Sequence, residues 1–112
     1  MLKTIPLRQQ GMEPQIQRTD ESKEFYTEER CHILELSNTD SDTALSIARI
    51  RVEPGTTTAW HRIIDTAERY VILSGSGRVE VEELEAQDVQ QNDVVIIPAS
   101  ARQRITNTSD SD

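Results

Sequence analysis

The fold is decided by residues 55–75, which read GTTTAWHRIIDTAERYVILSG. Two runs in this stretch, 59–64 and 68–73, are rich in β-branched and aromatic residues and are short enough for strands. No helical period of 3.6 residues continues through the breakers that surround them. The stretch therefore predicts two strands of an all-β domain.

The side chains of these two strands can be assigned to faces, because successive residues of a strand point to opposite sides of the sheet. His61 then shares a face with Ile63, and Glu68 shares a face with Tyr70. Ile63 favours an inward direction for its face. We therefore expect a ligand pocket in the interior that is lined by His61, Ile63, Glu68 and Tyr70.

The rest of the chain after position 30 repeats this pattern of short alternating segments between turn signals. Gly75-Ser76-Gly77 is expected to join two strands in a tight turn. Such spacing indicates a sandwich or barrel and not alternating strands and helices. The further strands are expected at 31–36, 48–53, 78–84, 94–97 and 103–108.

Residues 1–29 differ from the rest, because they are mostly polar and are interrupted by Pro6 and Pro14. We interpret them as an N-terminal arm, which is either disordered or lies as an edge strand on a partner subunit. The predicted domain organisation is an arm over residues 1–29 and a barrel over 30–112.

Length and composition exclude several classes of protein. The chain has 112 residues, which fit one domain, and only 35% of them are hydrophobic. A net charge of -8 argues against nucleic acid and anionic membranes as partners. Neither a membrane-length apolar run nor a signal peptide is present, so we expect a cytoplasmic protein. Cys31 is the only cysteine and is expected in a buried strand.

Two spaced motifs give the chain a resemblance to a known family. Gly55, five residues, His61, Arg62, Ile63, four residues, Glu68, six residues and Gly75 resemble the first motif of the cupin family. Its second motif has glycine, proline, glycine, histidine and asparagine at the spacing of Asn92, Pro98, Ser100, Gln103 and Asn107, and this series is similar to it. The resemblance implies a double-stranded β-helix, or jelly-roll, cupin barrel. It also implies a further strand after Asn107, so we expect the family's final strand to be missing from this chain.

The resemblance also implies a divalent transition metal, commonly zinc, iron, manganese or nickel. The family's ligand positions correspond to His61, Ile63, Glu68 and Gln103, so Gln103 is expected as a fifth residue that lines the pocket. Ile63 cannot bind a metal, and the Gln103 carbonyl is a weaker ligand than imidazole. A site of His61, Glu68 and Gln103 completed by water is one possibility. The other is a metal-free cavity in which His61 hydrogen-bonds to Glu68 or Gln103.

Two functions follow from these possibilities. The first, which we favour, is a barrel that binds a small molecule through an eroded metal site. The second is an enzyme, either a metal-dependent oxygenase or isomerase or a metal-free isomerase or lyase that uses His61, Glu68 and Tyr70 as acid and base. The resemblance adds the expectation of a homodimer. We expect Arg49 and Arg51, which share a strand face, to be solvated or at an interface and not to clamp an anion.

Overall fold

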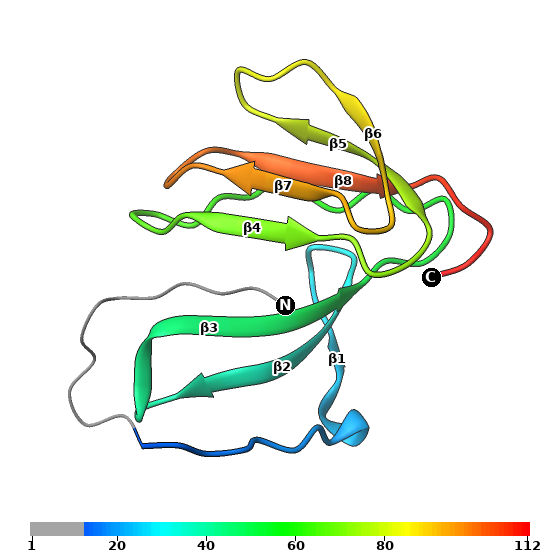
Figure 1. The fold of residues 1–112 in the computed structure, drawn as a ribbon. Coiled ribbons are helices and arrows are strands. Elements are labelled where there is room, and N and C mark those ends of the chain that lie inside the picture. Colours follow the sequence, from blue (N-terminus) through cyan, green and yellow to red (C-terminus); the bar gives the residue numbers. More distant parts are fainter. Residues whose placement is uncertain (1–12) are drawn as a thin grey trace.

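The computed structural model describes residues 13–112, and these residues form eight β-strands and one short 3-10 helix, η1 (Figure 1). None of the helical structure in this part of the chain is long and apolar enough to cross a membrane. The elements in chain order are η1 (Glu21–Lys23), β1 (Phe25–Tyr26), β2 (His32–Thr39), β3 (Asp42–Arg51), β4 (Glu68–Val71), β5 (Ser76–Val81), β6 (Gln87–Gln90), β7 (Val94–Ile97) and β8 (Gln103–Asn107).

The strands are arranged in three antiparallel sheets. One contains β1, β2 and β3, a second pairs β4 with β7, and the third has the order β6-β5-β8. In Figure 1 the last five strands form one body, and the long β2–β3 hairpin lies below it. The all-β prediction is confirmed. The pairing among the described residues gives separate sheets, and the closed barrel stays a prediction.

The core lies between the β4–β7 sheet and the β6-β5-β8 sheet. Its centre consists of Val79 and Val81 on β5 together with Val95 and Ile97 on β7, all at most 7% exposed. Each pair is separated by one residue that points outward, as expected for a strand with one buried face. Tyr70 of β4 packs against this core, so the inner faces of both sheets meet.

Two strand predictions near the site are wrong. Residues 59–64 form no strand, and His61 takes part only in an isolated bridge with Gln103. The turn at Gly75-Ser76-Gly77 does not join two paired strands, because β4 pairs with β7 and β5 pairs with β6 and β8. A Cβ atom at Gly77 would lie 2.9 Å from the Thr106 carbonyl oxygen, so glycine there permits close pairing with β8.

The N-terminal segment adds structure that the sequence did not predict. Strand β1 pairs with the start of β2, with Phe25 opposite Ile33 and Tyr26 opposite His32. Asp20 caps η1 by accepting a hydrogen bond from the Ser22 N–H. Residues 1–12 of the expected arm lie outside the described residues, and its boundary at position 29 stays a prediction.

Candidate functional site

Gln103 lies at the centre of the candidate site. It begins β8 on the inner face of its sheet and is completely buried, with 0% of its surface exposed. Its backbone N–H donates to the His61 carbonyl at 2.9 Å, and the His61 N–H donates to the Gln103 carbonyl at 3.1 Å. These two bonds hold His61 beside Gln103, although His61 belongs to no long strand.

The side chain of Gln103 connects three other side chains. Its amide nitrogen donates to Nε2 of His61 and, over 3.3 Å, to Oε1 of Glu68. Its amide oxygen accepts a hydrogen bond from the Tyr70 hydroxyl. Nδ1 of His61 donates to the Ala59 carbonyl at 2.9 Å, and Nε2 faces the Gln103 amide nitrogen and accepts from it.

This arrangement fixes which way the Gln103 amide points. If the amide were turned about, its oxygen would face the Glu68 carboxylate, which can only accept. The Tyr70 hydroxyl would then lose the oxygen to which it donates. In the observed orientation both N–H groups and the oxygen have partners. We call His61, Glu68, Tyr70 and Gln103 the Gln103 cluster.

The N-terminal segment contributes a second carboxylate at the edge of the Gln103 cluster. Oε2 of Glu29 lies 3.7 Å from Nε2 of His61, and the Glu29 carbonyl accepts from the Ala59 N–H at 3.0 Å. Sequence reasoning missed Glu29, which follows a run of acidic residues typical of a solvated surface. No local signal indicates that this residue meets His61 across more than thirty positions of sequence.

The electrostatic environment of the Gln103 cluster is negative. Burial raises the pKa of Tyr70 far above its ordinary value, and the charges of Glu68, Cys31 and Glu29 raise it further. Burial likewise raises the pKa of the Cys31 thiol. Tyr70 is therefore a neutral hydrogen-bond donor and a poor source of protons. Chemically, the site offers hydrogen-bond acceptors at the carboxylates of Glu29 and Glu68.

The structure thus brings together four of the five residues predicted to line a pocket, and it leaves Ile63 outside. Ile63 is 43% exposed, and its carbonyl accepts from the Ser100 N–H at 3.0 Å. The predicted shared face with His61 is wrong because side chains alternate only while the chain stays extended, and no strand continues past His61.

The metal ion that the resemblance implies does not fit these residues. Among the described residues, no three or more histidine, cysteine, aspartate and glutamate side chains form a group that could hold a metal. His61 and Glu68 are ordinary ligands, but the group that faces them both is the N–H side of the Gln103 amide. A hydrogen-bond donor cannot coordinate a cation.

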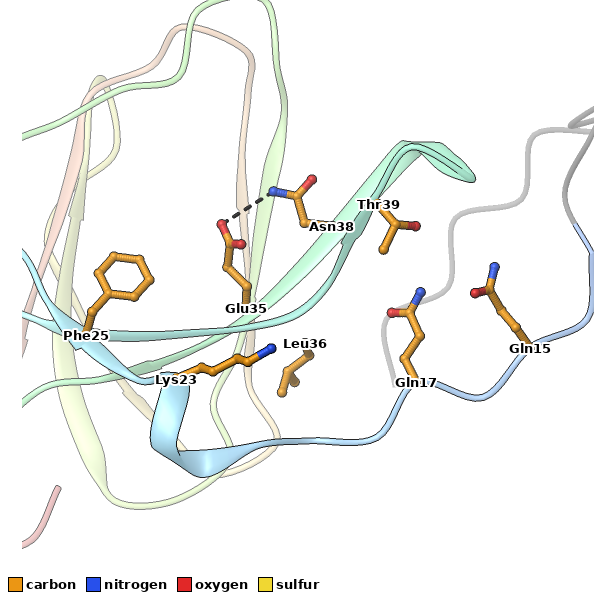
Figure 2. Close-up of a pocket in the computed structure, with 8 residues that line it drawn as sticks. All are labelled: Gln15, Gln17, Lys23, Phe25, Glu35, Leu36, Asn38 and Thr39. Atoms are coloured by element: carbon orange, nitrogen blue, oxygen red, sulfur yellow. Dashed lines mark hydrogen bonds between the residues drawn. The ribbon is translucent and has the colours of Figure 1, made fainter.

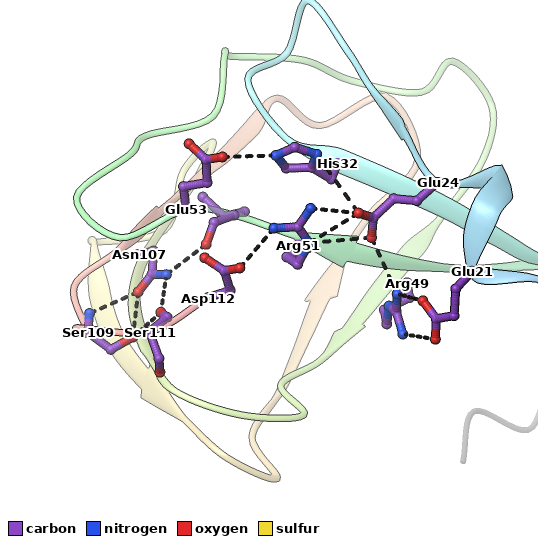
Figure 3. A network of polar contacts seen from close by, with 11 residues as sticks. Glu21, Glu24, His32, Arg49, Arg51, Glu53, Asn107, Ser109, Ser111 and Asp112 are labelled. Atoms are coloured by element: carbon purple, nitrogen blue, oxygen red, sulfur yellow. Dashed lines mark hydrogen bonds and ion pairs between the residues drawn. The ribbon is translucent and has the colours of Figure 1, made fainter.

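A second polar network joins the N-terminal segment to β3 (Figure 3). Arg51 donates to the Glu24 carboxylate at 2.6 Å and to Asp112 at 2.8 Å, and Arg49 donates to Glu21 at 2.6 Å. The hydrogen bonds from these arginines hold the pKa values of Glu24 and Glu21 below their ordinary value. Both arginines thus bind carboxylates of their own chain while each side chain stays 33% exposed, and an interface with a partner on this face stays a prediction.

An open groove lies on the outside of the β2–β3 hairpin (Figure 2). Its volume is about 410 Å³, and it shares no residue with the Gln103 cluster. Most of the lining residues are polar, and Phe25 and Leu36 are the two apolar ones. The groove is lined by Gln15, Gln17, Lys23, Phe25, Glu35, Leu36, Asn38 and Thr39.

Comparison with protein families identifies the class of the domain. Residues 48–112, more than half of the chain, match the cupin domain family Cupin_2. This chain therefore belongs to the cupin family, as its two motifs indicated. The match spans β4 to β8 and thus includes every residue of the Gln103 cluster. No curated protein matches the sequence significantly.

Solved structures show the same fold at low sequence identity. A predicted oxalate decarboxylase from Thermotoga maritima has a TM-score of 0.74 and 19% identity, and the match covers 87% of this chain and 90% of that one. A Cupin 2 conserved barrel domain protein from Salinispora arenicola has a TM-score of 0.70 and 16% identity, covering 88% and 82%. The Drosophila melanogaster CENP-C structure bound to CAL1 has a TM-score of 0.66 and 17% identity, covering 84% and 78%.

Proposed function

We propose that this cupin binds a small molecule through the Gln103 cluster and Glu29, and that the molecule is an amine and not a carboxylic acid. The observation that carries this proposal is a pair of carboxylates: Glu29 lies 3.7 Å from His61, and Glu68 accepts from Gln103. Among the described residues neither carboxylate forms an ion pair with arginine or lysine. Both are left with lone pairs to offer.

Solvent reaches the edge of the Gln103 cluster on this side. The side chain of Glu29 is 43% exposed and that of His61 is 22% exposed, while Gln103 behind them is fully buried. A solute can therefore meet Glu29 and His61 without opening the core. An ammonium group donates three hydrogen bonds and carries the charge that this environment lacks. A carboxylate would add a like charge beside Glu29 and Glu68.

The relatives in fold do not decide the ligand. One neighbour is described as a predicted oxalate decarboxylase and another is bound to a second protein, so the same fold serves different tasks. A dianion such as oxalate would enter the negative environment of the Gln103 cluster without a cation to hold it. The structure favours binding over acid and base catalysis by Tyr70, because the raised pKa of its hydroxyl makes it a poor proton donor.

The proposal is tested with three probes of equal chain length, namely putrescine, butanediol and succinate. Each is titrated into ¹⁵N-labelled protein while the side-chain amide signals of Gln103 are followed by NMR. We expect putrescine to bind at least about fivefold more tightly than butanediol, and succinate to leave the signals unchanged, because one charge pair near a protein surface contributes about that much.

Matched variants locate the effect. Glu68→Gln and Glu29→Gln remove one carboxylate each and should weaken putrescine binding about fivefold. Glu85→Gln removes the same charge from an exposed turn and should leave binding unchanged. Succinate binding as tightly as putrescine, or an equal loss in all three variants, would overturn the proposal.

A further inference from the structure

We infer that the side-chain amide of Gln103 takes the place of a metal ion in this domain. An ion at the centre of such a site holds its ligands together by accepting their lone pairs. Here the Gln103 amide nitrogen receives the lone pairs of His61 Nε2 and Glu68 Oε1 through its two N–H groups. One neutral side chain thus joins the two side chains that would otherwise serve as metal ligands.

The position of Gln103 makes this role a property of the fold and not of a mobile surface side chain. The residue is completely buried, and its backbone is paired with Val81 on one side and bridged to His61 on the other. Its amide oxygen is held by Tyr70. Every polar atom of the side chain is occupied, and no buried side-chain nitrogen or oxygen among the described residues lacks a partner.

A cation would therefore have to break three hydrogen bonds before it could bind. The amide would have to turn about to offer its oxygen, which removes the acceptor to which the Tyr70 hydroxyl donates. In return the ion would gain one amide oxygen, a weaker ligand than imidazole for transition metals. The balance favours the hydrogen-bonded state, independently of which small molecule binds at the edge of the cluster.

The position of the Gln103 amide between His61 and Glu68 predicts which single substitution creates a metal site. Gln103→His places an imidazole where the amide lies, beside His61 and Glu68 and within reach of the edge where Glu29 lies. Ile63→His also adds an imidazole, but at a side chain that is 43% exposed outside the Gln103 cluster. The two variants add the same ligand type to the same chain and differ only in position.

The test measures metal binding directly. Wild type and both variants are purified without nickel affinity steps or chelator, and their zinc, iron, manganese and nickel contents are determined by mass spectrometry. Binding of zinc and nickel is then measured by calorimetry at pH 7, with circular dichroism as the check on folding. We expect wild type to hold less than about a tenth of an equivalent, and Gln103→His to bind zinc at least about tenfold more tightly than Ile63→His.

Wild-type protein is also followed by NMR, so that the inference does not depend on the variant folding. Zinc added in excess should leave the side-chain amide signals of Gln103 in place. Stoichiometric metal in wild type, a zinc-induced shift of those signals, or an equal gain in Gln103→His and Ile63→His would each overturn the inference.

Discussion

The hydrogen bond between Tyr70 and Gln103 should be worth much more to stability than an ordinary exposed one, and a double-mutant cycle measures it. The first perturbation is Gln103→Leu, which keeps the volume of the side chain and removes its polar atoms. Three partners then lose a hydrogen bond. His61 and Glu68 can replace it with water at about 0.5–1 kcal/mol each, whereas the Tyr70 hydroxyl is largely buried and costs about 2 kcal/mol when left without a partner.

The expected loss in free energy of unfolding for Gln103→Leu is therefore about 3 kcal/mol, which a domain of this size can tolerate. Tyr70→Phe alone leaves the fully buried Gln103 oxygen without its donor and should cost about 1.5 kcal/mol. In the Gln103→Leu background the same change removes the orphaned hydroxyl and should recover most of the about 2 kcal/mol that it costs. The coupling between the two positions is then about 3 kcal/mol.

Urea unfolding followed by the fluorescence of Trp60, the only tryptophan, gives the four free energies of the cycle. A control pair is formed by Thr106 of β8 and Thr57, which is bridged to it; their hydroxyls are 2.8 Å apart but only partly buried. Removing both hydroxyls should show a coupling below about 0.5 kcal/mol, because water can replace either partner. A coupling as small between Tyr70 and Gln103 would refute the view of Gln103 as the centre of a buried polar cluster.

Three further predictions concern other parts of the molecule. The hydrogen bond from Arg51 is the main cause of the lowered pKa of Glu24, so this carboxylate stabilises the fold above pH 4.5, its ordinary pKa, and stops doing so as the pH falls through the lowered pKa. In an acid titration of stability, Arg51→Gln should lack this pH-dependent loss. Glu83 has φ of 67°, so Glu83→Gly should raise the free energy of unfolding by about 0.5–1 kcal/mol, whereas Glu85→Gly, which removes the same charge, should not. Equal changes in the free energy of unfolding of the two variants in urea would contradict this prediction. The expected homodimer stays a prediction, and the exposed face of the β4–β7 sheet, where Ile96 is 64% exposed, is the surface we expect it to use. Light scattering should then find monomers of Ile96→Glu, and a monomeric wild type would contradict the prediction.

The strands could be predicted from the sequence wherever one face is buried. Val79 and Val81 alternate with outward residues and form the core, and Glu68 and Tyr70 share the inner face of β4 as expected. Strand β6 was missed because its residues, Gln87–Gln90, are polar apart from one valine, so alternation gives no signal there. Alternation of apolar and polar residues reflects burial of one strand face, so it does not reveal a strand whose side chains are mostly exposed.

The contacts between distant segments could not be predicted in the same way. Glu29 meets His61, and Arg51 binds both Glu24 and Asp112. In the sequence, the charged residues among them look like ordinary solvated surface residues. The failed placement of Ile63 has a related cause. The prediction assumed that side chains keep alternating from His61 to Ile63, but His61 forms only an isolated bridge. One change of backbone direction is enough to move a side chain from the interior to the surface.

The departures from the family motifs fall into two groups that physical chemistry treats differently. Where the second motif has glycine, this chain has Asn92 and Ser100, and both keep the left-handed backbone, with φ of 73° and 67°. Asparagine tolerates that conformation, and serine does so at a cost of about 1 kcal/mol, so the turns survive the change of residue. Ile63 and Gln103 stand where the motif has metal-binding imidazoles, and no backbone geometry depends on an imidazole. Turn positions are constrained by folding itself, whereas ligand positions are constrained only by the ion, so the fold can persist after the chemistry at its centre has changed from coordination to hydrogen bonding.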